Sequence, residues 1–143
     1  MATSFKLFHD AALTQEISSA NPLTATQETG GALGPVDKTI YFGSTATDTK
    51  VQAVSSPGVD PIIIDIVDAD AGTGAPDTEF KLALSAGGLD TATAGASLSL
   101  SHTINSGVAS AVPIYTRRTS ALTVAGAYTD VSLASVSVIE TPV

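Results

Sequence analysis

The chain has no cysteine and no tryptophan among its 143 residues. Without cysteine, a disulfide framework, a zinc–thiolate site, a thiol nucleophile and an iron–sulfur cluster are all excluded. No apolar run approaches the roughly 18 residues of a membrane-spanning helix, and the N-terminus lacks the charged start and long apolar core of a secretory signal. We therefore expect a soluble protein, and this length suffices for one domain whose core needs neither metals nor disulfides.

Charge is also scarce, and basic charge most of all. Charged residues make up 14% of the chain, against about 25% in ordinary domains. Fourteen acidic and six basic residues give a net charge of −8. The chain has no stripe of lysine and arginine, so we expect it to bind neither nucleic acid nor anionic membranes. Alanine, threonine and serine supply 57 of the 143 residues, a composition typical of sheets with threonine and serine on their exposed faces.

Apolar and polar residues alternate with the period of a β-strand in several segments. In "FKLALS" (80–85) the alternation places Leu82 and Leu84 on one face and Lys81 on the other, and "SLSLS" does the same for Leu98 and Leu100. These four leucines are predicted to lie in the core. Further strands are predicted at 38–43, 49–54, 111–119 and 128–140, the last with a bulge or turn near Ala134 and Ser135, where the alternation changes phase.

The segment "PIIIDIVD" (61–68) is almost continuously apolar, which predicts a strand covered on both faces. Turn-forming sequences such as "SSPGVDP", "SAGG" and "NSG" separate the strands at short intervals. About seven or eight short strands predict an all-β fold, an antiparallel β-sandwich of immunoglobulin-like or related design. One segment, "GGLDTATAGAS", could instead form a single helical turn between two strands.

The first 36 residues differ in composition from the remainder. "SSANPLTATQETGGALGPVD" has few apolar residues and several prolines and glycines, so we predict an extended N-terminal arm over 1–36 and the sandwich domain over 37–143. "FKLF" with "LTQEI" could be a strand that pairs with the sandwich or with a neighbouring subunit. Phe5, Leu7 and Phe8 are its apolar anchors, and we expect the arm to become ordered only where another chain receives it.

An acidic segment follows the buried strand. Its carboxylates are of the kind that calcium prefers, but "DADAGTGAPD" does not match the calcium loop of an EF-hand. The favoured interpretation is a solvated hairpin turn between strands 61–67 and 79–85, whose acids discourage edge pairing. A loop calcium ion is the first alternative and an acid/base pair the second. The acids in question are Asp65, Asp68, Asp70, Asp77 and Glu79.

Other catalytic patterns are weaker. The two histidines, His9 and His102, are predicted to be structural, since His102 only continues the alternation of Leu98 and Leu100. No G-x-S-x-G motif occurs, although a Ser–His–Asp triad can be dispersed along a chain. Arg117 and Arg118 are predicted to lie on opposite faces of a strand, one paired with a carboxylate. We therefore predict no catalytic, cofactor-binding or metal-binding residues, no cofactor and no enzymatic activity.

Several stretches resemble immunoglobulin-like accessory and decoration (cement) proteins of tailed-phage virions: "KTIYFGST", "PIIIDIVDAD" and "AGASLSLSHTINSGVASAV", preceded by a polar arm. The resemblance covers about residues 36–140. It implies a structural protein that binds the major capsid protein or another virion protein on a capsid or tail lattice. It also implies a homo-oligomer in a symmetric particle, located in the virion and assembled in the host cytoplasm. The alternatives are a carbohydrate- or surface-binding sandwich module, which usually displays exposed aromatic rings, and a hydrolase on a β scaffold.

Overall fold

The computed structural model describes residues 3–18, 20–24, 35–68, 77–119 and 131–143. Its strands are joined by turns and by short 3-10 helices, which confirms the predicted all-β class. The described residues include no helix with the length and apolarity that crossing a membrane requires. The strands are β1 (Lys6–Phe8), β2 (Val36–Gly43), β3 (Thr49–Ala53), β4 (Ile63–Asp68), β5 (Phe80–Ala83), β6 (Leu98–Ser99), β7 (Thr103–Asn105), β8 (Val112–Arg118), β9 (Val131–Ser135) and β10 (Val138–Pro142), and the 3-10 helices are η2 (Asp77–Glu79), η3 (Gly87–Asp90) and η4 (Val108–Ser110).

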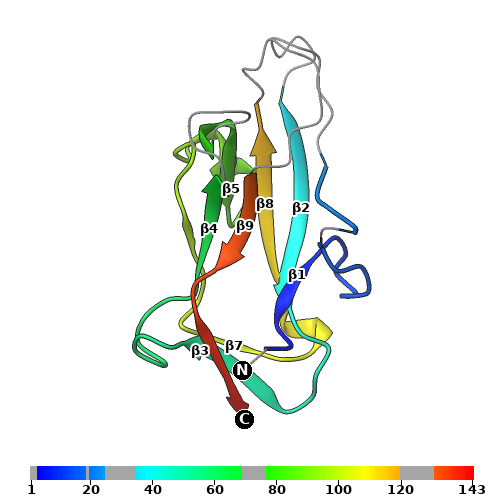
Figure 1. Cartoon of the computed structure of the whole chain (residues 1–143), viewed down its shortest axis with the longest axis vertical. Coiled ribbons are helices and arrows are strands. Elements are labelled where there is room, and N and C mark those ends of the chain that lie inside the picture. Colours follow the sequence, from blue (N-terminus) through cyan, green and yellow to red (C-terminus); the bar gives the residue numbers. More distant parts are fainter. Residues whose placement is uncertain (1–2, 19, 25–34, 69–76, 120–130) are drawn as a thin grey trace.

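The strands form three antiparallel sheets. One has four strands in the order β1-β2-β8-β5, and its long strands β2 and β8 dominate Figure 1. The other two have three strands each, in the orders β6-β4-β9 and β10-β3-β7. We call the four-stranded sheet the first layer. The two three-stranded sheets together are the second layer, because backbone hydrogen bonds continue from one into the other.

The continuity of the second layer is clearest at the step from β9 to β10. Val136 donates its N–H to the carbonyl of Ile63 (2.9 Å), and the next residue, Ser137, accepts from the N–H of Val54 (3.1 Å). The partner strand thus changes from β4 to β3 within two residues. β3 and β4 therefore lie end to end as the middle strand of the layer, which we call the central row. The chain leaves this row only for residues 55–61. In Figure 1 the chain runs on from β9 alongside β3 to the C-terminal end.

A single core fills the space between the two layers. From the first layer Ile40, Phe42 and Ile114 are almost completely buried, and from the second layer Val51 and Ile64 are fully buried. These residues occupy alternate positions of their strands, as the period of two requires. One apolar cluster contains residues from both layers, which is the packing of a β-sandwich.

The structure differs from three details of the predicted strands. β4 is fully covered on one face only: Ile64 and Ile66 are buried, whereas on the other face Ile63 and Asp65 are half-buried and Val67 is exposed. Leu82 is buried as predicted, but Leu84 is 53% exposed because β5 ends at Ala83 and the chain turns toward η3. The predicted break in 128–140 exists, and it falls at residues 136–137, just beyond the predicted position.

The largest correction concerns the predicted arm. Residues 6–8 form β1, which pairs antiparallel with β2, so this segment belongs to the first layer. Phe5, Phe8 and Leu13 are buried, and the ring of Phe5 lies 6.0 Å from that of Phe42. The expectation that this segment needs another chain to become ordered is therefore wrong for residues 3–18. Its few apolar side chains suffice because each one enters the core of its own sandwich.

Candidate functional site

The two strands that flank the predicted acidic segment do not pair with each other, as a hairpin would require. β4 pairs with β6 and β9 in the second layer, whereas β5 pairs with β8 in the first. β4 and β5 therefore belong to different layers, and they direct apolar residues into the shared core from opposite sides. Asp70 lies outside the described residues. Among the residues that the structure does describe, no group of three or more potential metal ligands comes together.

The acids at the two ends of this connection have separate surroundings. Asp65 is half-buried on β4, on the opposite face from the core residues Ile64 and Ile66. Glu79 is buried in η2 and accepts a hydrogen bond from Nη2 of Arg118 at 3.2 Å. The guanidinium of Arg118 also lies over the ring of Phe80, 5.5 Å from its centre. A buried carboxylate needs such a partner, so the structure gives Glu79 a structural role at the end of β8.

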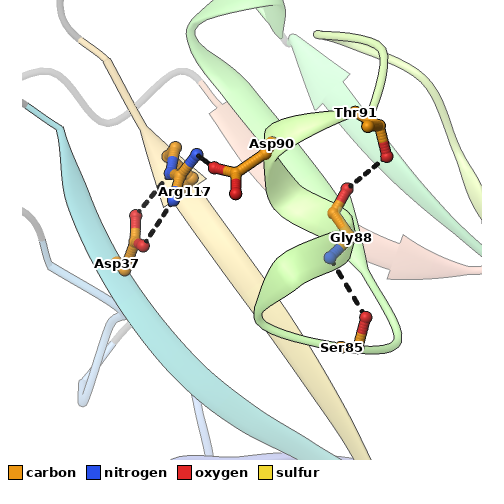
Figure 2. A network of polar contacts seen from close by, with 6 residues as sticks. All are labelled: Asp37, Ser85, Gly88, Asp90, Thr91 and Arg117. Atoms are coloured by element: carbon orange, nitrogen blue, oxygen red, sulfur yellow. Dashed lines mark hydrogen bonds and ion pairs between the residues drawn. The ribbon is translucent and has the colours of Figure 1, made fainter.

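Arg117 is held by two carboxylates from different elements (Figure 2). Its Nε and Nη2 donate to the two carboxylate oxygens of Asp37 on β2 at 2.8 and 2.9 Å. Its Nη1 donates to Asp90 at the end of η3, also at 2.8 Å. The hydrogen bonds from Arg117 lower the pKa of Asp37 and raise that of the guanidinium. Arg117 therefore fixes the η3 turn to the first layer.

The two arginines lie on opposite sides of β8, as predicted, but both of them are paired with carboxylates rather than one. The two histidines make local contacts. Nε2 of His9 lies 3.0 Å from the carbonyl oxygen of Asn21, and Nδ1 of the exposed His102 lies 3.2 Å from the hydroxyl of Thr103. These contacts fit structural histidines and assemble no nucleophile, base and orienting acid of the kind that a catalytic triad requires.

A further polar cluster, around Glu140, was not predicted from the sequence. The carboxylate of Glu140 on β10 accepts hydrogen bonds from the N–H and hydroxyl of Ser4 (both 2.7 Å), the hydroxyl of Thr49 (2.8 Å) and that of Thr3 (3.1 Å). Burial raises the pKa of Glu140, but the hydrogen bonds outweigh burial and lower the pKa to about 2. We call these four residues the Glu140 clasp. The clasp ties the segment before β1 to the second layer, and Figure 1 shows the start of β1 at the same end of the molecule as the C-terminal end of β10.

An apolar surface lies where the central row of the second layer is interrupted. A pocket of about 430 Å³ opens there, lined by residues from the row and from the step between β9 and β10. Asp60 is its charged member, and the hydroxyl of Ser55 donates to this carboxylate at 2.7 Å. Val54 lines the pocket and is 53% exposed, and Val59, which directly precedes the lining residue Asp60 in the chain, is 76% exposed. We call the following five residues the valine patch: Val54, Val59, Pro61, Ile63 and Val136.

The described aromatic rings offer no comparable surface. Phe5, Phe8 and Phe42 are buried, and the remaining three described rings are half-buried, with Arg118 over that of Phe80. Stacking on a sugar needs an exposed aromatic face, so nothing in the described residues favours the carbohydrate-binding alternative. Comparison of the whole chain with protein-family models, with curated proteins and with solved structures found no match.

Proposed function

We propose that this chain is a structural protein of a virus particle, a decoration or cement protein that binds the capsid or tail lattice of a tailed phage. It stabilises that lattice through contacts with the major capsid protein or another virion protein. The observation that carries the proposal is the valine patch. Exposed and contiguous apolar surfaces on folded proteins mark sites of contact with other proteins. Here the exposed Val54 lines an open pocket, and the exposed Val59 directly precedes another of its lining residues, Asp60.

The charges around the patch indicate what kind of surface fits it. Asp60 lies in the pocket, and Asp65 follows Ile63 two residues later on the same face of β4. The whole chain carries a net charge of −8. A partner surface with an apolar centre and lysine or arginine around it would complement this patch in both respects. Repetition over a symmetric lattice would let modest contacts of this kind add up through avidity.

The test uses particles assembled from the major capsid or tail-tube protein of the phage that would encode this chain under the proposal. The full-length chain is mixed with these particles and separated on a density gradient, and the bound fraction is measured. We expect Val59→Asp to reduce binding at least tenfold, roughly the effect of placing a charge in an apolar contact. Val108→Asp is the matched control, since Val108 is 48% exposed in η4, outside the patch.

The control should bind like the unmodified chain. Two results would contradict the proposal: failure of the unmodified chain to sediment with the particles, or equal binding by Val59→Asp. Thermal unfolding of both variants checks that neither substitution disturbs the fold, because both side chains are exposed.

A further inference from the structure

β9 is an edge strand, and one of its two sides has no partner among the described strands. Each of its residues pairs with β4, and the N–H of the following residue, Val136, also points to β4, where it donates to Ile63. The backbone groups of an antiparallel strand point alternately to its two sides. The N–H and C=O groups of Val131, Leu133 and Ser135 must therefore point away from β4. No strand in the described part of the chain pairs with that side.

β9 also lacks the features that normally keep an edge strand from pairing with another chain, which are charge, proline or very short length. β10 carries Glu140 and Pro142, and β5 carries Lys81. β6 and β7, on the opposite edge of the second layer, have only two and three residues. β9 has five residues, "VSLAS", with no charge and no proline. After Val131 it contains only serine, alanine and one half-buried leucine.

We propose that β9 pairs antiparallel with β9 of a second copy of this chain, around a twofold axis at Leu133. Leu133 is then paired with Leu133 of the second copy, and Ser132 is paired with Ala134 of the second copy. About six backbone hydrogen bonds can form between the two strands in this register. The pairing joins the second layers of two molecules into one continuous sheet, as in other cases of strand addition to a sheet edge.

The self-complementarity of an uncharged antiparallel strand, not the net charge of the chain, points to a second copy as the occupant. Two molecules that each carry −8 repel one another, so they meet most favourably where the contacting surfaces are uncharged. β9 provides such a surface, and an antiparallel strand pair with a twofold axis is complementary to itself. A contact of five residues per molecule is small, which indicates weak association in free solution. The pairing does not depend on the proposed function; only its use on a particle lattice does.

The test measures the mass of the full-length chain by sedimentation equilibrium. We expect a concentration-dependent change from monomer to dimer between about 10 µM and 1 mM, the range of a weak interface. Two variants add charge to the edge, positive in one and negative in the other: Ser132→Lys with Ala134→Lys, and Ser132→Glu with Ala134→Glu. Both positions are exposed, so the fold should tolerate them. Each variant alone should remain monomeric because like charges face each other across the axis.

An equimolar mixture of the lysine and glutamate variants should form heterodimers more tightly than the unmodified chain forms homodimers. The matched control is Ser99→Lys with Ser101→Lys, two exposed serines on the opposite edge of the second layer, and it should dimerise like the unmodified chain. A chain that stays monomeric at 1 mM, or lysine variants that still dimerise, would overturn the inference. Particle binding is measured separately through Val59→Asp, so a failure here is distinct from a failure of the proposed function.

Discussion

Replacing Glu140 by Gln should destabilise the protein measurably, although the side chain keeps its size. Gln presents one carbonyl oxygen and an amide that donates hydrogen bonds, whereas the four groups around Glu140 all donate to it. The substitution therefore removes a charged acceptor and places donors against donors. The segment before β1 should then lose its tie to β10, while β1 itself remains paired with β2.

The size of the effect can be worked from the pKa of Glu140. A fall from 4.5 to about 2 corresponds to at most ~3 kcal/mol of preference for the charged form in the folded state. Glu140 is partly exposed, and water screens part of this interaction, so we expect Glu140→Gln to cost about 1–2 kcal/mol. In a domain of this length the melting temperature should fall by about 3–6 °C.

The pH dependence gives the sharper test. Because the folded-state pKa of Glu140 is lowered, its stabilisation is complete above about pH 4.5 and disappears as the pH falls toward about 2. Gln does not titrate in this range. Calorimetric melting curves at a series of pH values should therefore show a gap between the unmodified chain and Glu140→Gln that is constant near neutrality and closes in acid.

The control for loss of one negative charge is Glu16→Gln. Glu16 forms an exposed ion pair with Lys6 at 2.9 Å, so its replacement should change the free energy of unfolding by less than about 1 kcal/mol. Equal melting temperatures for Glu140→Gln and the unmodified chain at neutral pH, or a gap that persists unchanged at pH 2, would refute the reasoning.

Other changes test the register and the packing of the sandwich. Leu82→Ala should cost about 2–5 kcal/mol in chemical denaturation, because it leaves a cavity in the core; Leu84→Ala should cost less than about 0.5 kcal/mol, and equal costs would contradict the observed end of β5. Phe5→Ala should cost about 3–5 kcal/mol, whereas a negligible cost would mean that the segment around β1 contributes nothing to the fold. Calcium and chelators should leave the melting temperature unchanged, since a tightly bound ion would stabilise the native state; a rise of several degrees with calcium would indicate a site.

The features that the sequence predicted correctly are local ones. The period-two alternation in 49–54 and 111–119 predicted β3 and β8, because a strand shows its two faces directly in consecutive residues. The change of phase in 128–140 predicted the break between β9 and β10 for the same reason. The helical alternative for "GGLDTATAGAS" corresponds to the 3-10 helix η3, which begins this segment.

The features that it did not predict depend on residues far apart in the chain. Whether the connection after β4 returns to the same sheet or crosses to the other layer is decided by which strands pair, and both outcomes suit the same turn sequence. The burial of Phe5 depends on its contact with Phe42, which no local pattern encodes. The donors to Glu140 come from Thr3, Ser4 and Thr49, which are 137, 136 and 91 residues away. The one local indication of the clasp was that Glu140, two residues after Val138, points to the same inner face of the predicted strand.

The interrupted central row of the second layer leaves residues 55–61 outside the ladder. Val54 and Ile63 are kept close together by their backbone hydrogen bonds to Ser137 and Val136. These bonds do not depend on the length of the chain between Val54 and Ile63. The excursion turns through Gly58, whose φ of 81° suits glycine. Its length is therefore a property that evolution, or an engineer, can alter while the sheet on either side stays intact. A foreign peptide inserted there should be displayed on the surface of a fully folded sandwich.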